Sequence, residues 1–147
     1  MNMLAAARRL ALALAFALPV AAAAQNAFTT QSVNMRAGPD RSFPLVAWIP
    51  AGTPVQVFGC LDGWRWCDVQ WGFNRGFVWS QFLQTSFGPQ PSIIFYGGPT
   101  IGLPLITFSI NSYWDSFYRN RPWWNNRNYW YGRPPPPPPP VWRPPPP

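Results

Sequence analysis

Hydrophobic residues occur in short runs between residues 28 and 87, and turn-forming residues separate these runs. Runs rich in β-branched and aromatic residues lie at 32–36, 45–49, 55–60, 66–71 and 76–79. Glycine, proline and Asp-Gly sequences interrupt them at a spacing of about ten residues. In the third run, Val55 and Val57 flank Gln56, which predicts a strand with one buried face. The pattern predicts an all-β domain, either a small barrel or a sandwich.

Beyond residue 87 the pattern changes. Residues 88–112 mix glycine and proline with apolar side chains, and the stretches 92–96 and 105–110 have strand-like composition. A hairpin appended to the edge of the sheet is one interpretation, and a flexible linker is the other. The run Ile93-Ile94-Phe95 is too apolar for a solvated linker, which favours the hairpin.

The N-terminal residues 1–24 have the organisation of a secretory signal peptide. Two arginines precede an apolar run over 10–20, and small alanines follow at 22–24. Cleavage after Ala24 would leave Gln25 as the first residue of the mature chain. A membrane anchor is the alternative, but the apolar stretch is shorter than the roughly 20 residues of a spanning helix and contains Pro19. We expect a periplasmic or secreted protein without a transmembrane anchor after cleavage.

Charged residues are of two kinds only. The 11 basic residues are all arginine, the four acidic residues are all aspartate, and the chain has no histidine. Because imidazoles and paired carboxylates do most acid–base catalysis and metal binding, we expect no enzymatic activity, no catalytic residue, no metal site and no cofactor. The mature chain would carry 9 − 4 = +5 charges. That excess favours anionic partners, or it serves only solubility.

Five pieces of the first segment resemble one known family, the bacterial SH3 (SH3b) domain. They occur in the family's order and spacing, as Val33-Asn34-Met35-Arg36-Ala37-Gly38-Pro39, Phe43-Pro44, Ile49-Pro50-Ala51-Gly52-Thr53-Pro54-Val55-Gln56-Val57, Trp66-Cys67-Asp68-Val69, and Arg75-Gly76-Phe77-Val78-Trp79 with Phe82-Leu83. The resemblance implies that residues 28–87 form a small SH3-like barrel. It also implies a targeting or ligand-binding module of the kind that accompanies cell-wall or periplasmic functions.

The two cysteines, Cys60 and Cys67, flank the turn at Asp62-Gly63. In an oxidising compartment a pair placed across a hairpin is expected to form a disulfide, which would stabilise so short a loop by roughly 2 to 3 kcal/mol. A redox-active or metal-binding pair would need Cys-x-x-Cys spacing or further Cys and His ligands. The sequence has neither, so we predict a structural disulfide.

Residues 113–133 interleave arginines with aromatic residues, and residues 134–147 are mostly proline. The first stretch suits stacking, cation–π contacts and binding of anions. Alternatively, 113–118 packs back onto the barrel as a short helix or turn. The stretch resembles extensions that follow SH3b domains in some secreted bacterial proteins, which implies a shared unit but no activity. The second stretch is expected to be a disordered polyproline II tail.

Two functional hypotheses follow, and both describe non-catalytic binding at the cell envelope. In the first, the barrel recognises peptidoglycan or cell-wall peptides through Trp48, Trp64, Trp66 and Trp79. In the second, a structural or adhesion protein binds anionic envelope polymers through Arg119, Arg121, Trp123, Trp124, Arg127, Trp130 and Arg133. Nucleic acid is not an expected partner, because export removes the chain from it.

Overall fold

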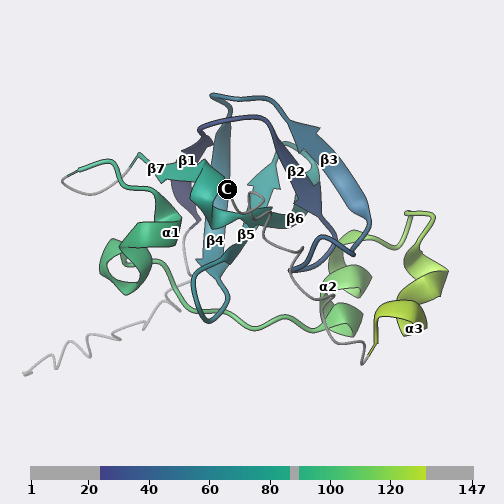
Figure 1. The fold of residues 1–147 in the computed structure, drawn as a ribbon. Helices are drawn as coiled ribbons and strands as arrows, with labels where there is room; N and C mark the ends of the chain where they lie inside the picture. Colours follow the sequence, from purple (N-terminus) through teal and green to yellow (C-terminus); the bar gives the residue numbers. More distant parts are fainter. Residues whose placement is uncertain (1–23, 87–89, 132–147) are drawn as a thin grey trace, which may run out of the picture.

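The computed structural model describes residues 24–86 and 90–131 (Figure 1). Its strands are β1 (Gln25–Thr29), β2 (Val33–Arg36), β3 (Leu45–Ile49), β4 (Pro54–Cys60), β5 (Trp66–Trp71), β6 (Asn74–Trp79) and β7 (Leu83–Thr85). Its α-helices are α1 (Ile94–Gly97), α2 (Ile110–Phe117) and α3 (Arg127–Trp130). Its 3₁₀ turns are η1 (Ser80–Phe82), η2 (Gly98–Ile101) and η3 (Trp124–Asn126).

The strands form one antiparallel sheet in the order β3-β2-β6-β5-β4-β1-β7. It curls around the core as in an SH3-like barrel (Figure 1), but β3 and β7 remain its two edges and the sheet is not closed. All five strands expected from the hydrophobic runs are present. The chain adds β1 and β7, which pair with each other, and β1 also pairs with β4.

Apolar and polar residues alternate along the strands, and the apolar ones face the core, as the sequence predicts. In β4, Val55 and Val57 are buried and Gln56 is exposed. Burying such a valine side chain is worth about 1.5–3 kcal/mol relative to leaving it in water. The expected disulfide is confirmed: Cys60 and Cys67 are bonded, face each other across β4 and β5, and are both fully buried.

The prediction of a hairpin within residues 88–112 is wrong. Where a strand was expected, Ile94–Gly97 forms a helical turn, and Gly98 then reverses the chain with a positive φ of 43°. Within the described residues, this segment pairs with the sheet through two isolated bridges and no strand ladder, Gln84 with Ile93 and Cys60 with Leu105. The helical turn buries Ile94 completely in the core, and this tertiary contact outweighs the strand propensity of a β-branched residue.

Residues 104–106 cross the end of β4 at very short range. The Cys60 amide donates to the Pro104 carbonyl at 3.1 Å, and the Ile106 amide donates to the Cys60 carbonyl at 2.9 Å. A β-carbon placed on Gly59 would lie 2.7 Å from the Pro104 oxygen and 2.6 Å from a methyl carbon of Ile106. Glycine is therefore required at this crossing, because backbone cannot move away as a flexible side chain can.

The rest of the described chain packs α2, η3 and α3 beside the sheet (Figure 1). From α2, Trp114 is fully buried and its indole N–H donates to the Ala37 carbonyl at 2.8 Å. Tyr118 is also buried and its hydroxyl donates to the Arg75 carbonyl at 2.6 Å. Of the two interpretations of residues 113–118, the structure has the one in which they pack on the sheet.

Three predictions fall outside the described residues, wholly or nearly so: the signal peptide over residues 1–24, of which only Ala24 is described, the binding role of Arg133, and the polyproline tail. Ala24 precedes β1, which starts at Gln25, where the mature chain is expected to begin. In the described segments, none of the helices combines the length and the hydropathy that crossing a bilayer requires.

Candidate functional site

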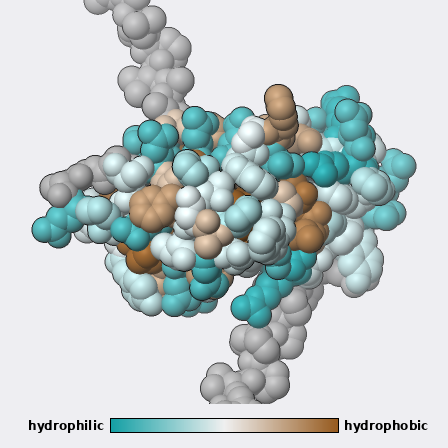
Figure 2. Space-filling view, turned by 90° about the horizontal axis from the view of Figure 1, so that it is seen from above, coloured by the Kyte–Doolittle hydropathy of each residue, from teal (hydrophilic) through white to brown (hydrophobic). Residues whose placement is uncertain are grey.

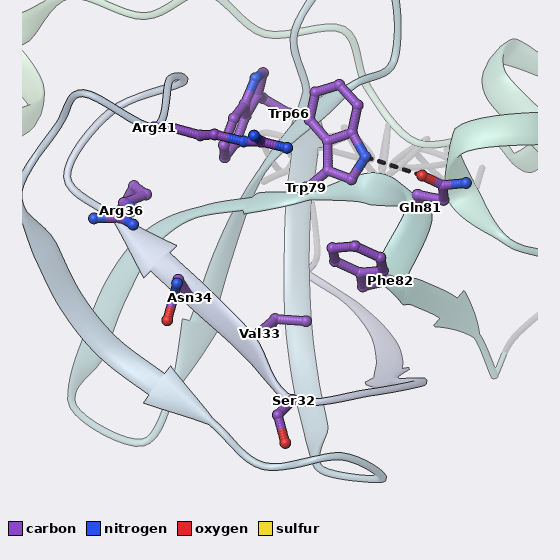
Figure 3. Close-up of a pocket in the computed structure, with 9 residues that line it drawn as sticks. All are labelled: Ser32, Val33, Asn34, Arg36, Arg41, Trp66, Trp79, Gln81 and Phe82. Atoms are coloured by element: carbon purple, nitrogen blue, oxygen red, sulfur yellow. Dashed lines mark hydrogen bonds between the residues drawn. The ribbon is translucent and has the colours of Figure 1, made fainter. Parts of the chain in front are cut away.

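An open cleft of about 530 Å³ lies on the sheet beside β2 and β6 (Figure 3). Its lining combines two indoles, two guanidinium groups and several neutral polar groups. The residues are Ser32, Val33, Asn34, Arg36, Arg41, Trp66, Trp79, Gln81 and Phe82. A concave surface with aromatic walls and a few polar groups is the usual form of a small ligand site.

The two indoles meet because their residues are cross-strand partners. Trp66 in β5 pairs with Trp79 in β6, and their rings pack edge to face with 5.3 Å between the ring centres. Both remain partly exposed. The Trp79 N–H donates to the Gln81 side-chain oxygen at 3.3 Å (Figure 3). This contact fixes the indole, while the rest of the ring surface stays available for stacking.

Both arginines of the cleft come from β2 and the loop after it. Arg36 donates to the Phe43 carbonyl at 3.4 Å, which orients its guanidinium, and the exposed Arg41 extends toward the indoles (Figure 3). No carboxylate is among the lining residues that the structure describes. The cleft therefore presents positive charge beside aromatic surface, a combination that suits a carboxylate or another anionic group.

The segment after the sheet extends this wall of the cleft. The Gln81 amide donates to the Tyr96 hydroxyl at 3.1 Å, which continues the contact from Trp79. The rings of Phe95 and Trp79 lie 5.8 Å apart, and those of Phe95 and Tyr96 lie 5.1 Å apart. Tyr96 is 71% exposed. Helix α1 thus adds aromatic surface next to the two cleft indoles.

The other two barrel tryptophans expected at a ligand site are not among the residues that line the cleft. Trp48 in β3 stands opposite Asn34 of β2, so it flanks the cleft on the same face of that ladder and is 56% exposed. Trp64 sits in the β4–β5 turn with a positive φ of 58°. Its ring lies against Gly98, and its carbonyl accepts a hydrogen bond from the Ser80 hydroxyl. The structure therefore does not bring Trp64 to the cleft.

The described arginines of residues 113–133, which we call the extension, have partners within the chain. Arg127 pairs with the Asp115 carboxylate at 3.0 Å and lies 4.0 Å from the Trp124 ring centre. Arg119 donates to the Asp115 carbonyl at 2.9 Å. Arg121 donates to the side-chain oxygen of Asn74 at 3.2 Å and lies over Trp123. Arg133 lies outside the described residues. The cation–π contacts expected here thus occur between residues of the extension itself.

A buried polar network joins the extension to the sheet. Arg75 forms two hydrogen bonds of 2.7 Å with Asp68, and its guanidinium lies 3.5 Å from the Phe58 ring centre and 4.6 Å from that of Phe117. The Tyr113 hydroxyl donates to the same carboxylate at 2.6 Å. Asp68 is 6% exposed, so the network is inaccessible to a large ligand.

The protonation states in this network follow from its burial. Burial alone lowers the pKa of Arg75, but the hydrogen bonds and charge of Asp68 outweigh it and raise that pKa. Burial, reinforced by the Asp68 charge, raises the pKa of Tyr113 far above the ordinary range. Burial likewise raises the pKa of the Tyr118 hydroxyl. The network is therefore one of fixed charges and neutral phenols, which gives it a structural role.

Residues 24–86 and 90–131 hold no group of three or more Asp, Glu, His or Cys side chains arranged for a metal ion.

Of the residues that line the cleft, the sequence predicted Trp66 and Trp79 as ligand-binding but not Arg36 or Arg41. A signal for Arg36 was present: Val33 and Met35 are buried in β2, so the alternate positions Asn34 and Arg36 must face away from the core. Arg41 offers no such periodic signal, because it lies in the loop between β2 and β3.

Comparison with protein families identifies the fold that carries this cleft. The family described as Bacterial SH3 domain matches residues 31–84, from just before β2 into β7. No curated protein and no solved structure matches the chain. Domains of this family are generally binding modules, often for the cell wall. The matched range contains all the cleft residues, with β1 and residues 90–131 as additions. Residues 31–84 of this chain are therefore a bacterial SH3 domain.

Proposed function

We propose that this protein is a non-catalytic recognition module of the bacterial envelope, whose SH3 cleft binds a cell-wall peptide through a carboxylate and the adjoining apolar or amide groups. The observation that carries the proposal is the composition of the cleft, where two arginines adjoin two contacting indole rings. Among the described residues that line it, none carries a carboxylate.

The cleft residues match the chemical groups of a short peptide. A guanidinium binds a carboxylate through two parallel hydrogen bonds, and Arg36 is already oriented by the Phe43 carbonyl. The side chains of Asn34 and Gln81 offer amide donors and acceptors for peptide groups. The indoles supply surface for the apolar parts. Prior ordering of the Trp79–Gln81 pair reduces the entropy lost on binding.

The proposed location is the periplasm or the exterior of the cell. A buried disulfide and a bacterial SH3 domain are both compatible with an oxidising compartment. Export would follow from the signal peptide expected over residues 1–24. There the cleft would meet peptidoglycan and its peptides, which carry free carboxylates.

The alternative hypothesis, in which the extension binds an anionic envelope polymer, receives less support from the contacts that its arginines make. Arg119, Arg121 and Arg127 already donate to oxygen atoms of Asp115 or Asn74. Binding a polyanion through these side chains would require breaking those contacts or sharing their donors. Arg41 lines the open cleft and has no hydrogen bond within the described residues, and Arg36 has only the long bond of 3.4 Å to the Phe43 carbonyl there, so the cleft offers positive charge at a lower cost.

The test is sedimentation of the mature chain with purified peptidoglycan sacculi. We expect Trp79→Ala and the double variant Arg36→Gln/Arg41→Gln each to weaken binding by about tenfold or more, as loss of charged hydrogen bonds or a stacking surface implies. Binding should also weaken with salt, since the arginines are solvent-exposed or partly so. Arg65→Gln, which removes an exposed arginine outside the cleft, is the matched control.

Equal binding by the parent and both cleft variants would contradict the proposal. If Arg119→Gln/Arg121→Gln/Arg127→Gln instead abolished the binding, the extension would be the binding surface.

A further inference from the structure

A second groove, of about 700 Å³, lies where the extension meets the loop between β2 and β3. Three asparagines, a serine and two aromatic residues line it: Ser42, Asn125, Asn126, Asn128, Tyr129 and Trp130. Figure 2 shows hydrophilic residues gathered at this end of the molecule. No charged residue belongs to the lining within the described chain, which distinguishes this groove from the SH3 cleft.

The three asparagines present unused hydrogen-bonding groups. Asn125, Asn126 and Asn128 are exposed, and their amide side chains have no hydrogen-bond partner among the residues that the structure describes. Each amide offers two N–H donors and one carbonyl acceptor in a plane. Three such groups together match a ligand with neighbouring groups that both donate and accept, such as hydroxyls on adjacent carbon atoms.

The aromatic part of the groove is rigidly held. The Trp130 indole N–H donates to the Ser42 carbonyl at 3.0 Å. Its ring stacks on that of Phe43, with 6.1 Å between the ring centres and 17° between the ring planes. On another side it contacts Trp114, which is fully buried. Tyr129 lies next to it and is 54% exposed. An amphipathic ring in a fixed position can cover the C–H face of a flat ligand without loss of side-chain entropy.

The arginine within residues 125–130 does not line the groove. Arg127 lies between the asparagines in sequence, but its guanidinium binds the Asp115 carboxylate and covers the Trp124 ring. The groove therefore combines neutral amides, a hydroxyl and aromatic surface, which disfavours an anion and suits an uncharged ligand.

We infer that this groove binds a neutral glycan, with the asparagine amides on sugar hydroxyl or acetamido groups and the aromatic rings along the sugar's C–H face. It adjoins the SH3 cleft through consecutive residues of one loop, because Arg41 lines the cleft and Ser42 lines the groove. A polymer that carries both peptide and glycan can occupy both. Assigning the glycan to the cell wall rests on the function proposed above; assigning the groove to sugar does not.

The test is titration of the ¹⁵N-labelled mature chain with a tetramer of β-1,4-linked N-acetylglucosamine, which has no peptide and no charge. We expect the signals of the three asparagine amides and the Trp130 indole to shift, with equal affinity at 0.05 M and 0.5 M salt (about 14 and 4 Å of screening length). Asn125→Ala/Asn128→Ala should weaken binding about tenfold, since each net hydrogen bond contributes a few-fold. Asn120→Ala, an exposed asparagine of the extension outside the groove, should bind as the parent does.

Two results would overturn the inference. One is no binding of the tetramer by a parent that is folded, as shown by cooperative thermal unfolding. The other is binding that Trp79→Ala removes and Asn125→Ala/Asn128→Ala does not, since the sugar would then lie in the cleft. The two proposals can fail separately: tetramer binding in the groove, together with sacculus binding that ignores the cleft variants, rejects the proposed function and retains the glycan site.

Discussion

Trp79 and Trp114 both donate a hydrogen bond from the indole N–H, yet they have different surroundings. Trp79 donates to the side chain of Gln81 at the wall of an open cleft and stays partly exposed. Trp114 donates to the Ala37 backbone carbonyl and is fully buried between the extension and the sheet. The arginines differ in the same way. Arg36 faces the cleft, while Arg75 is held by two bonds to Asp68 and by two aromatic rings.

Arginine and tryptophan content therefore does not by itself indicate a binding surface. In the SH3 cleft these residues have unoccupied faces and donors, whereas in α2 and the buried network the same groups are consumed by internal contacts. A structural group has its ring face and donors buried by the chain, whereas a binding group keeps part of them exposed to solvent.

The largest expected effect is on stability, from Trp114→Ala. Removing this fully buried indole leaves a cavity and an unpaired Ala37 carbonyl, so we expect a loss of about 3–5 kcal/mol in the free energy of unfolding. Trp79→Ala should lower stability less, because the ring is already partly in water. Urea unfolding of both variants measures the difference. A larger loss from Trp79→Ala would reverse the roles assigned to the two residues.

The disulfide gives the next effect. Replacing both cysteines in Cys60→Ala/Cys67→Ala should lower the free energy of unfolding by roughly 2 to 3 kcal/mol, because the seven-residue separation closes a short loop in the unfolded chain. Thermal unfolding with and without reductant measures the same contribution in the parent. Alkylation of the native protein without reductant should find no free thiol; finding two would refute the disulfide.

The buried network should make stability depend on alkaline pH. Since folding raises the pKa of Tyr113 and Tyr118, their contribution is fully present below the unfolded pKa of about 10 and is lost as pH rises above it. Tyr113→Phe should cost about 1–2 kcal/mol at neutral pH, because Asp68 loses a hydrogen bond. It should also reduce the alkaline decline. Unfolding measured from pH 7 to 11 tests both, and stability that rises over this range would contradict the sign.

The smallest effect is expected from Arg127→Gln. Its ion pair with Asp115 is partly exposed, with side-chain exposures of 32% and 43%, so breaking it should cost only about 0.2–1 kcal/mol. Arg75→Gln is the comparison, because it leaves the Asp68 carboxylate buried with fewer partners and should cost several-fold more. Similar losses from the two variants would mean that burial does not separate these arginines.

Much of the sheet was predictable because its signals are local. Alternation in 55–60 and turn residues such as Asp62-Gly63 indicate strands and hairpins without knowledge of distant contacts. β1 was missed because it is short and half polar, and its strand form depends on pairing with β4 and β7. The same dependence on distant contacts explains the error over 92–96, where burial of Ile94 selects a helical turn.

The candidate site was predictable in part for the same reason. Trp66 and Trp79 were expected from their strands, and the hairpin register places them together. Nothing local reveals that Arg41 returns to that cleft, or that Trp64 turns toward Gly98. For the extension, composition suits aromatic and cationic contacts but does not reveal whether the partner is a ligand or the chain itself, since both use the same chemistry.

The crossing at Gly59 limits how residues 90–131 could be transferred between proteins. Because a β-carbon there would collide with the Pro104 oxygen, residues 90–131 could be grafted only onto an SH3 barrel that has glycine at the corresponding position of its fourth strand. A recipient with alanine or a larger residue would push residues 104–106 off the strand and lose their two backbone hydrogen bonds to Cys60. Modular engineering with this domain should therefore treat that single glycine as the connector.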